Sequence, residues 1–269
     1  MVAIGYSAVS LISYDYQYLL QSLPHYIDEV EEVILGLDKY RQTWNGNKFV
    51  VPDKFFQQLE AMDPAGKIRI VEDNFYIPNF TALENDTRER NFLSNFVKPG
   101  NWIISLDADE VILNPAALKD YLASLSDTDV SVLAQAVTVF KRLPDAILIA
   151  SSKIKVGTFP IATKAVNSYI GARYTQQRKV ICPAKLVHYS WGRSEAELYM
   201  KLTNWGHSTH FDVESYFSLW KAIDGNNYRY LRNFHPIWPE EWVELIKVSE
   251  EEIGSLSFSA LHSHAPDLD

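Results

Sequence analysis

Three acidic side chains stand close together in this sequence, and their types and spacing suggest chemistry. Asp107, Asp109 and Glu110 directly follow residues 102–106, a short apolar run with the length and composition of a buried strand. Carboxylates are costly to bury without a partner, and two of them one residue apart can both reach a hard divalent cation. The alternative is that Asp107 caps a turn while the other two acids are solvated. The apolar residues 111–113 after the motif favour a cation site.

The elements expected around this motif alternate between strand and helix. Such alternation is typical of a wound α/β sheet, in which ligands bind outside the carboxyl ends of the strands. Asp38, at the exit of the second predicted strand, and the acids after the fourth strand both occupy such ends. The predicted elements are strands at residues 9–13 (with a start as early as residue 2), 30–37, 67–71 and 102–106, and helices at residues 14–23, 55–59 and 81–97.

The second half of the chain continues the mixture of elements, less regularly at residues 159–178. We expect a single α/β domain over residues 1–269, with a mixed, mainly parallel sheet flanked by helices and with C-terminal helices. Its expected parts are a first half (1–113), a second half (114–235) and a C-terminal helix and tail (236–269). The further predicted elements are helices at residues 115–124, 195–204, 216–223 and 239–252, and strands at residues 130–140, 146–150 and 184–188.

Composition excludes several classes of protein. The net charge is −9 and there is no dense block of Lys and Arg, which argues against a nucleic-acid partner. Cys182 is the one cysteine, so an intramolecular disulfide and a cysteine-based zinc site are excluded. The N-terminus lacks the basic start of a signal peptide, and no apolar run reaches the roughly 18 residues of a transmembrane segment. We therefore expect a cytoplasmic protein without a transmembrane segment.

Several segments together resemble the GT-A-fold glycosyltransferases, in particular the large, bacterial-type, family-2-like group with a D-x-D motif. The resemblance covers most of the chain. It includes the opening strand and helix, and the acid that ends the second strand. The segments that carry it further are TRERN (87–91) on a helix that leads into GNWIISLDADE (100–110), then LVHYSWGR (186–193) and KLTNWGH (201–207).

This resemblance implies a nucleotide-sugar donor, a UDP-sugar in preference to a GDP-sugar, and an acceptor hydroxyl on a glycan or another molecule. It also implies a divalent cation, Mn²⁺ or Mg²⁺. Asp107 and Asp109 match the acids that hold the metal and the donor diphosphate, and His188 matches a third metal ligand. By position, Asp38 matches the acid that contacts the base, and Arg90 can reach donor phosphate or the D-x-D carboxylates; for Arg90 an exposed helix charge is the alternative. In this scheme residues 1–113 bind the nucleotide sugar and residues 114–235 face the acceptor.

The catalytic residues are less clearly marked. A divalent cation neutralises the charge that develops on the departing nucleoside diphosphate, and an inverting enzyme also needs a base for the acceptor hydroxyl. Many inverting relatives carry an E-D pair downstream of the metal motif, and residues 111–200 contain none. Asp109 and Glu110 are the catalytic candidates, although Glu110 could instead support the metal site from behind. Further candidates for the base are Asp145, Glu195 and Glu197.

Other interpretations remain open. In a haloacid-dehalogenase-type phosphatase Asp107 would be the nucleophile and Asp109 the acid/base. That family carries the motif on its first strand, whereas here about a hundred residues precede it. A catalytically inactive nucleotide-sugar-binding protein and a nucleotidyltransferase are further alternatives. His207 and His210 have metal-ligand spacing too, with a structural role as the alternative, whereas His25 and His235 flank prolines and are expected in loops.

Overall fold

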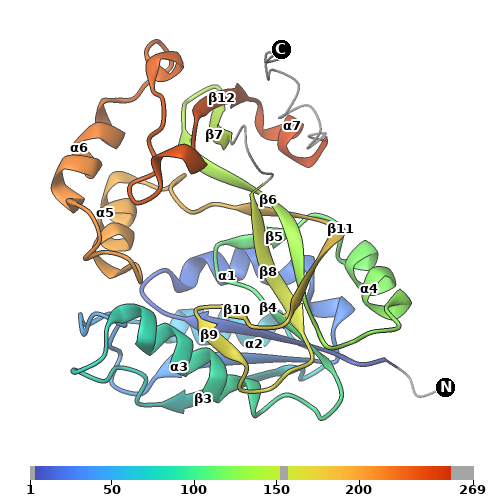
Figure 1. Ribbon diagram of the computed structural model, residues 1–269. Helices are drawn as coiled ribbons and strands as arrows, with labels where there is room; N and C mark the ends of the chain where they lie inside the picture. The colour runs from blue at the N-terminus through green and yellow to red at the C-terminus, as the bar shows by residue number, and fades with distance from the viewer. Residues whose placement is uncertain (1–3, 152–156, 256–269) are drawn as a thin grey trace.

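The computed structural model describes residues 4–151 and 157–255, and within these ranges ten strands form one sheet and two form a second, small sheet (Figure 1). Helices flank the large sheet. It is parallel where the first half of the chain builds it and mixed beyond. This arrangement confirms the predicted α/β, Rossmann-like fold class.

The first half of the chain contributes four adjacent parallel strands, in the order β4-β1-β2-β3. They lie close to where the sequence predicted them. Because parallel strands end at the same edge, Asp38 at the end of β2 and the acids that follow β4 share one edge of the sheet. These strands are β1 (Tyr6–Ile12), β2 (Glu32–Asp38), β3 (Ile68–Asp73) and β4 (Trp102–Ser105).

The helices of this half differ in regularity. α2 (Asp53–Ala61) and α3 (Ala82–Ser94) confirm predicted helices, and α3 begins with a capping box in which the Thr81 hydroxyl accepts from the Glu84 backbone N–H. The helix predicted at residues 14–23 is present as a continuous run of short helical turns over residues 16–25, of which only four residues are α-helical. These turns are 3₁₀ segments at Tyr16–Tyr18 and Leu23–His25 with α1 (Leu19–Ser22) between them, and a further 3₁₀ segment follows at Ile27–Glu29.

After the acidic motif the chain adds antiparallel strands and crosses back to the first half. The strand β8 pairs antiparallel with both β4 and β6 and so joins the two halves of the sheet. The long β6 runs from the part of the molecule that contains β4 into the part that contains β7, and we call these two parts the lobes (Figure 1). The elements of this part are β5 (Glu110–Ile112), α4 (Pro115–Ser124), β6 (Val130–Arg142), β7 (Ile147–Ser151), β8 (Thr158–Thr163) and β11 (Arg178–His188).

Pairing between β5 and β11 brings two distant segments together at the motif. In this antiparallel pair His188 stands opposite Glu110 and Val187 opposite Val111. The backbone N–H of Tyr189 then donates to the Asp109 carbonyl at 2.9 Å. The sheet register therefore places the histidine beside the acidic loop.

The small sheet is a hairpin of β9 (Tyr169–Gly171) and β10 (Tyr174–Thr175), which packs on α3. Asn91 on α3 ties this hairpin down, since its side-chain amide donates to the Tyr169 carbonyl and accepts from the Tyr169 N–H at 2.8 and 3.0 Å. Arg173 lies between the two strands of the hairpin and is thereby directed at the motif.

The C-terminal part corrects one prediction: the helix predicted at residues 239–252 is wrong up to Val248, and only its last residues, from Glu250, are helical. A single 3₁₀ turn at Pro239–Glu241 is followed by the strand β12, which pairs antiparallel with β7 at the sheet edge. Hydrogen bonding to that edge and burial of Leu245 and Val248 outweigh the local helical pattern. The elements of this part are α5 (Glu195–Asn204), α6 (Val213–Ala222), a 3₁₀ turn at Tyr228–Tyr230, β12 (Glu244–Val248) and α7 (Glu250–Ser255).

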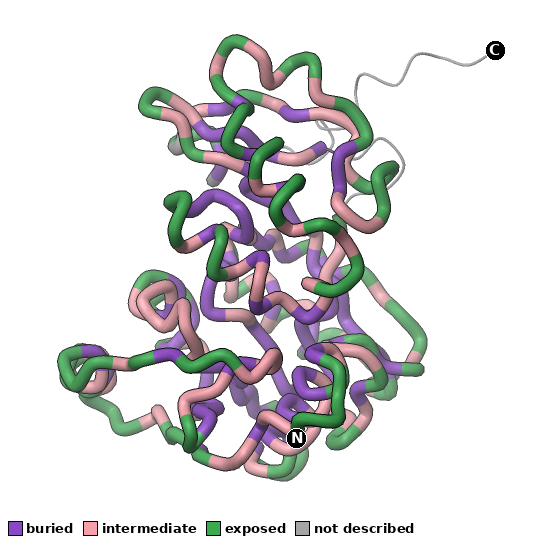
Figure 2. The backbone as a smooth tube through the Cα atoms, turned by 90° about the vertical axis from the view of Figure 1, so that its left-hand side faces the viewer, coloured by how far each residue is buried: buried purple, intermediate pink, exposed green. Residues whose placement is uncertain are grey.

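Buried backbone runs through the centre of both lobes (Figure 2). One core cluster contains Trp102 and Phe55 beneath the first half of the sheet. Another, with Phe140, Trp191 and Trp220, packs α5 and α6 onto β6 and β7. Among the described residues, no helix is both long and apolar enough to cross a membrane.

Candidate active site

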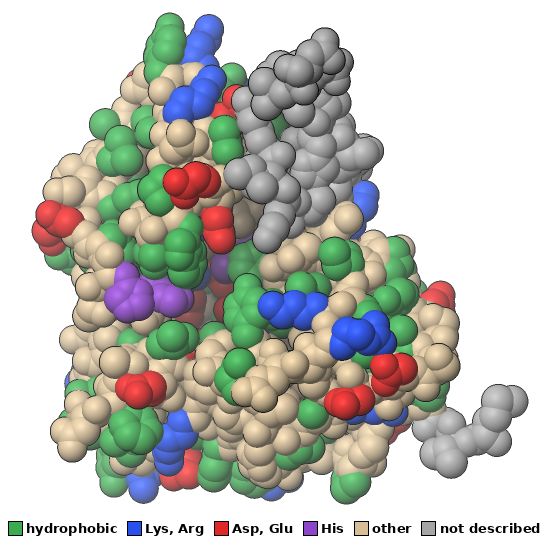
Figure 3. All heavy atoms as spheres, viewed as in Figure 1, with side chains coloured by type: hydrophobic (Ala, Val, Ile, Leu, Met, Phe, Trp, Pro, Cys, Tyr) green, Lys and Arg blue, Asp and Glu red, His purple; other side chains and the backbone are tan. Residues whose placement is uncertain are grey.

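A cavity of about 400 Å³ opens at the carboxyl edge of the parallel strands, a size suited to a small-molecule ligand. Figure 3 shows a hollow between the lobes, with histidine side chains at its rim and acidic side chains inside. The ends of β1 and β2 and the loop after β4 line one side of the cavity, while loops after α5 and before β12 line the other.

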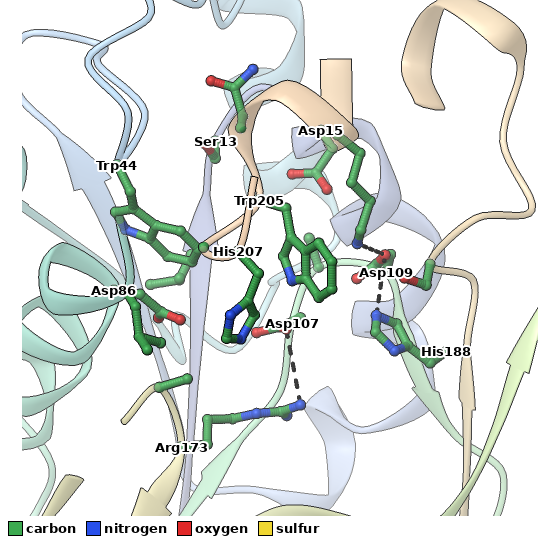
Figure 4. A pocket seen from close by; sticks show the side chains of 18 of the residues that line it. Ser13, Asp15, Trp44, Asp86, Asp107, Asp109, Arg173, His188, Trp205 and His207 are labelled. Carbon is green, nitrogen blue, oxygen red and sulfur yellow. Dashed lines mark hydrogen bonds and ion pairs between the residues drawn. The ribbon is translucent and has the colours of Figure 1, made fainter. Parts of the chain in front are cut away.

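The three side chains predicted as metal ligands meet in this cavity. Asp107, Asp109 and His188 each offer one ligand atom, and these atoms lie within 4.8 Å of one another (Figure 4). The two acids come from the loop between β4 and β5, and the histidine ends β11. Two carboxylates and an imidazole are a suitable donor set for Mn²⁺ or Mg²⁺.

His188 carries unused hydrogen-bonding capacity. Both ring nitrogens are buried, and neither has a hydrogen-bond partner among the residues that the structure describes. Nε2 lies 3.5 Å from Asp109 Oδ2, too far for a strong hydrogen bond. Buried polar atoms are normally satisfied, so an orphaned imidazole beside two carboxylates fits a divalent cation in this position.

Asp109 is buried and surrounded by cations. Arg193 Nη2 and Lys201 Nζ lie 2.5 and 2.7 Å from its Oδ2. Burial alone would raise the pKa of this carboxyl, but Lys201, His188 and Arg193 together hold the pKa well below its usual range. Asp109 is therefore ionised, which is the form that a divalent cation binds.

Asp107 is held from the α3 side. Arg90 Nη2 donates to its Oδ1 at 2.7 Å and also donates from Nε to the buried Asp86 at 2.5 Å, while Arg173 Nη2 lies 3.9 Å from Asp107 Oδ2. Burial opposes ionisation, yet Arg90 and Arg173 keep the pKa of Asp107 below its usual range. The structure thus places Arg90 against a D-x-D carboxylate with its side chain buried, whereas a contact with donor phosphate stays a prediction.

Glu110 lies behind the motif and does not line the cavity. Its side chain is fully buried and forms a bidentate pair with Arg173 at 2.6 and 2.5 Å. It also accepts a hydrogen bond from the Asp107 N–H at 2.9 Å. Since a catalytic base must reach substrate, this geometry favours a positioning role for Glu110, the alternative named from the sequence.

Asp38 lines the cavity, but its oxygens are already engaged. The carboxylate accepts hydrogen bonds from four backbone N–H groups and so ties together the loops that follow β2 and β3. A direct contact between Asp38 and a nucleobase stays a prediction. The donors are Tyr40 and Gln42 to Oδ1, at 2.8 and 3.0 Å, and Phe75 and Tyr76 to Oδ2, at 2.8 and 3.4 Å.

Sequence reasoning missed an acidic flank on α3. Asp86 and Glu89 line the cavity beside Arg90, and Trp44 donates from Nε1 to Glu89 at 2.7 Å. Burial, with a smaller contribution from the Asp86 charge, raises the pKa of Glu89 to about 8, although the Trp44 hydrogen bond opposes the shift. The available signal was the spacing of Asp86, Glu89 and Arg90, which puts them on one helix face.

The opposite side is an aromatic wall, made of Trp205, His207, His235, Trp238 and Trp242. The rings meet edge to face or stacked, with 5.0 Å between the Trp205 and His207 centroids and 5.4 Å between His235 and Trp238. Burial, assisted by His207, lowers the pKa of His235 to about 4, and its Nδ1 accepts from two backbone N–H groups. His235 is therefore neutral near pH 7.

The remaining predicted residues lie elsewhere. His207 and His210 approach with their Nδ1 atoms 3.1 Å apart, but in the described chain no three-ligand group includes them. None of the three further base candidates lines the cavity. Asp145 is exposed and pairs with Lys247, Glu195 is exposed on α5, and Glu197 caps α5 through Ser194.

No protein-family model and no curated protein match this sequence. Similar solved structures include S. aureus TarS, as residues 1–349 (16% identity, 55% of this chain and 41% of that chain, TM-score 0.34) and as a second TarS structure (17%, 56%, 24%, 0.37). GalNAc-T7 with UDP, GalNAc and Mn²⁺ is also similar, with 11% identity, 98% of this chain and 58% of that chain covered and a TM-score of 0.44. So is 4-diphosphocytidyl-2C-methyl-D-erythritol synthase, with 12% identity, 70% of this chain and 76% of that chain covered and a TM-score of 0.34.

These neighbours comprise GT-A glycosyltransferases, TarS and GalNAc-T7, and one nucleotidyltransferase. This chain spans between a quarter and three fifths of the TarS and GalNAc-T7 chains. Identities below 20% and TM-scores below 0.5 assign no activity to it. The site geometry must therefore carry the functional conclusion.

Proposed function

We propose that this protein is a metal-dependent glycosyltransferase, which moves a sugar from a nucleotide-sugar donor to an acceptor hydroxyl. The observation that carries the proposal is the group of Asp107, Asp109 and His188 in a cavity at the carboxyl edge of parallel strands. The unpartnered ring nitrogens of His188 support it further, because a bound cation would satisfy one of them.

In this proposal the three side chains hold Mn²⁺ or Mg²⁺ together with the donor diphosphate. The bound cation would supply Lewis-acid neutralisation of the departing diphosphate. Asp109 acts catalytically by holding that cation. Arg90 keeps Asp107 ionised and correctly turned, and Glu110 anchors Arg173 beneath the loop.

We assign the nucleotide sugar to the side of the cavity built by residues 1–113. Trp44 and Asp38 both line this side, near the ends of β1 and β2. An indole face suits stacking on a nucleobase, and Asp38 fixes the loops around it. A UDP-sugar is the favoured donor, with a GDP-sugar as the alternative.

We assign the acceptor to the opposite side, which residues 114–235 and the segment after residue 235 build. The aromatic wall offers apolar faces with polar edges, a combination that suits a glycan. The described part of residues 236–269 supplies Trp238 and Trp242 to this wall. Residues 4–151 and 157–255 thus act as one unit around a shared cavity.

A thermal-shift screen tests the proposal. UDP, GDP and their sugars are added to the full chain with and without Mn²⁺, since a ligand that binds the native state stabilises it by RT ln(1 + [L]/Kd). We expect at least one nucleotide to raise the melting temperature in Mn²⁺ and much less in EDTA. No shift with any nucleotide, or metal-dependent phosphate release from phosphomonoesters, would contradict the proposal and favour the phosphatase alternative.

A further inference from the structure

One oxygen of the candidate metal site already carries cations from the protein itself. Asp109 Oδ2 lies 2.5 Å from Arg193 Nη2, 2.7 Å from Lys201 Nζ and 3.5 Å from His188 Nε2. The first two distances are those of charge-assisted hydrogen bonds. A divalent cation that took this oxygen would meet the ammonium and the guanidinium at close range.

The two cations are held very differently. The Arg193 side chain is completely buried, donates to the Ser190 carbonyl at 3.0 Å and to Asp15 at 2.8 Å, and lies over the Tyr18 ring. These contacts fix the guanidinium independently of Asp109. Arg193 therefore stays beside Asp109 whether or not a cation is bound.

Lys201 has no comparable support. It stands in the last turn of α5, lines the cavity and is partly exposed. Within the described chain its ammonium has one hydrogen-bond partner, Asp109 Oδ2. A lysine side chain is a flexible chain of four carbons, so rotation about its bonds can move this ammonium away without moving the helix.

We propose that Lys201 is a built-in counter-ion, which occupies Asp109 until a divalent cation arrives and must then move away. The inference rests on the proposed metal site at Asp107, Asp109 and His188. Like charges on one carboxylate oxygen repel in a buried site, so both Arg193 and Lys201 oppose a divalent cation there. The fixed guanidinium opposes it constantly, whereas the mobile ammonium can move away and remove its share of the repulsion. In the metal-free protein the Lys201 ammonium helps to offset the desolvation of the buried Asp109 carboxylate. Without Lys201, only Arg193 would offset it.

The test is a titration of Mn²⁺ into the nucleotide-free full chain, followed by the electron paramagnetic resonance signal of free Mn²⁺. Lys201→Met removes the ammonium but keeps the volume and the helix propensity of the side chain. Lys221→Met on α6 is the matched control, because Lys221 is exposed, packs over the Phe217 ring and changes the net charge equally. We expect the Kd for Mn²⁺ to fall by at least about tenfold in Lys201→Met and to change by less than about twofold in the control.

The outcomes separate this inference from the proposed function. If wild type binds Mn²⁺ and Lys201→Met binds it equally or more weakly, the counter-ion role is overturned while the metal site stands. If neither protein binds Mn²⁺, the metal site of the proposed function fails, and the inference with it. Lys201→Gln provides a second variant should Lys201→Met fold poorly, and the same tightening is expected because the amide is uncharged.

Discussion

The two sides of the cavity differ in the kind of side chain that lines them. One, here called the charged wall, carries Asp107, Asp109 and the basic side chains that pair with them, and the other is the aromatic wall. On the sheet side, Asp107 and Asp109 are ionised and clamped by Arg90 and Arg193 at 2.7 and 2.5 Å. On the opposite side, Trp205 and Trp238 meet their neighbours through ring contacts on loops. Chemistry needs charges that are held in place, here by buried ion pairs, whereas recognition can rely on side chains that meet only through ring contacts. The contrast supports our proposal that the charged wall carries the chemistry and that the aromatic wall binds the acceptor.

The strongest way to break this contrast is to loosen the charged wall from behind. Glu110→Gln leaves the Arg173 guanidinium buried without its carboxylate partner, so we expect a loss of about 3–5 kcal/mol in the free energy of unfolding by urea denaturation. Glu29→Gln is the control, because Glu29 pairs with Lys119 at the surface and should cost no more than about 1 kcal/mol. Equal losses in both variants would show that the wall is not rigidly held.

Removing a charge from the front of the same wall should abolish chemistry. Asp109→Asn keeps the shape of the side chain but not the charge that a cation requires, so we expect sugar transfer to fall by about 100- to 1,000-fold. Asp145→Asn, an exposed acid outside the cavity, should leave the rate unchanged. Rates within tenfold of wild type in Asp109→Asn would move catalysis away from the charged wall.

The α3 flank of the charged wall gives a pH signature. The pKa of Glu89 is about 8 in the folded protein and about 4.3 in an unfolded chain. The folded state therefore binds the extra proton between these values, and this contribution to stability is lost as the pH rises from about 4.3 through about 8. Glu89→Gln does not titrate.

The wild-type protein should thus lose stability relative to this variant as the pH rises, so the free energy of unfolding of Glu89→Gln minus that of wild type should increase by at least about 1 kcal/mol between pH 5 and pH 8. Chemical denaturation at several pH values measures this difference. A difference that stays constant with pH would mean that Glu89 is ionised in the fold and that this flank is wetter than its burial indicates.

The smallest effect is expected on the aromatic wall. Trp238 is 47% exposed, so Trp238→Ala should fold normally and should raise the KM for the acceptor by about three- to tenfold, with an unchanged Kd for Mn²⁺. Trp238→Phe should recover part of the loss. A change in metal affinity, or no change in KM, would remove the distinction between the walls.

Much of the fold could be predicted from the sequence, because its signals are local. Apolar runs predicted the four parallel strands, and helices were predicted close to where α3 and α5 lie, each of which begins with a capping box. The strand β12 was mistaken for a helix since a short apolar segment next to a free sheet edge has no distinctive period. Only the sheet neighbour decides its structure.

The candidate site divides in the same way. The spacing of Asp107 and Asp109 predicted them as site residues, and the family resemblance predicted His188. Most ion-pair partners of the acidic motif could not be predicted, because Glu110 pairs with Arg173 across 63 positions and Asp109 pairs with Arg193 and Lys201 across 84 and 92. A charge in a sequence gives no indication of a partner so far away. Apart from Arg90, the residues that tune the acids became visible only in the folded protein.

The most direct test of the central claim is anomalous diffraction from crystals soaked in Mn²⁺ and UDP. A cation that bridges the three side chains should give a peak between Asp107, Asp109 and His188, about 2.0–2.6 Å from the nearest oxygens. The Lys201 ammonium should then have left Asp109. An anomalous map without a peak in this cavity, or with its peak at His207 and His210 instead, would contradict the account.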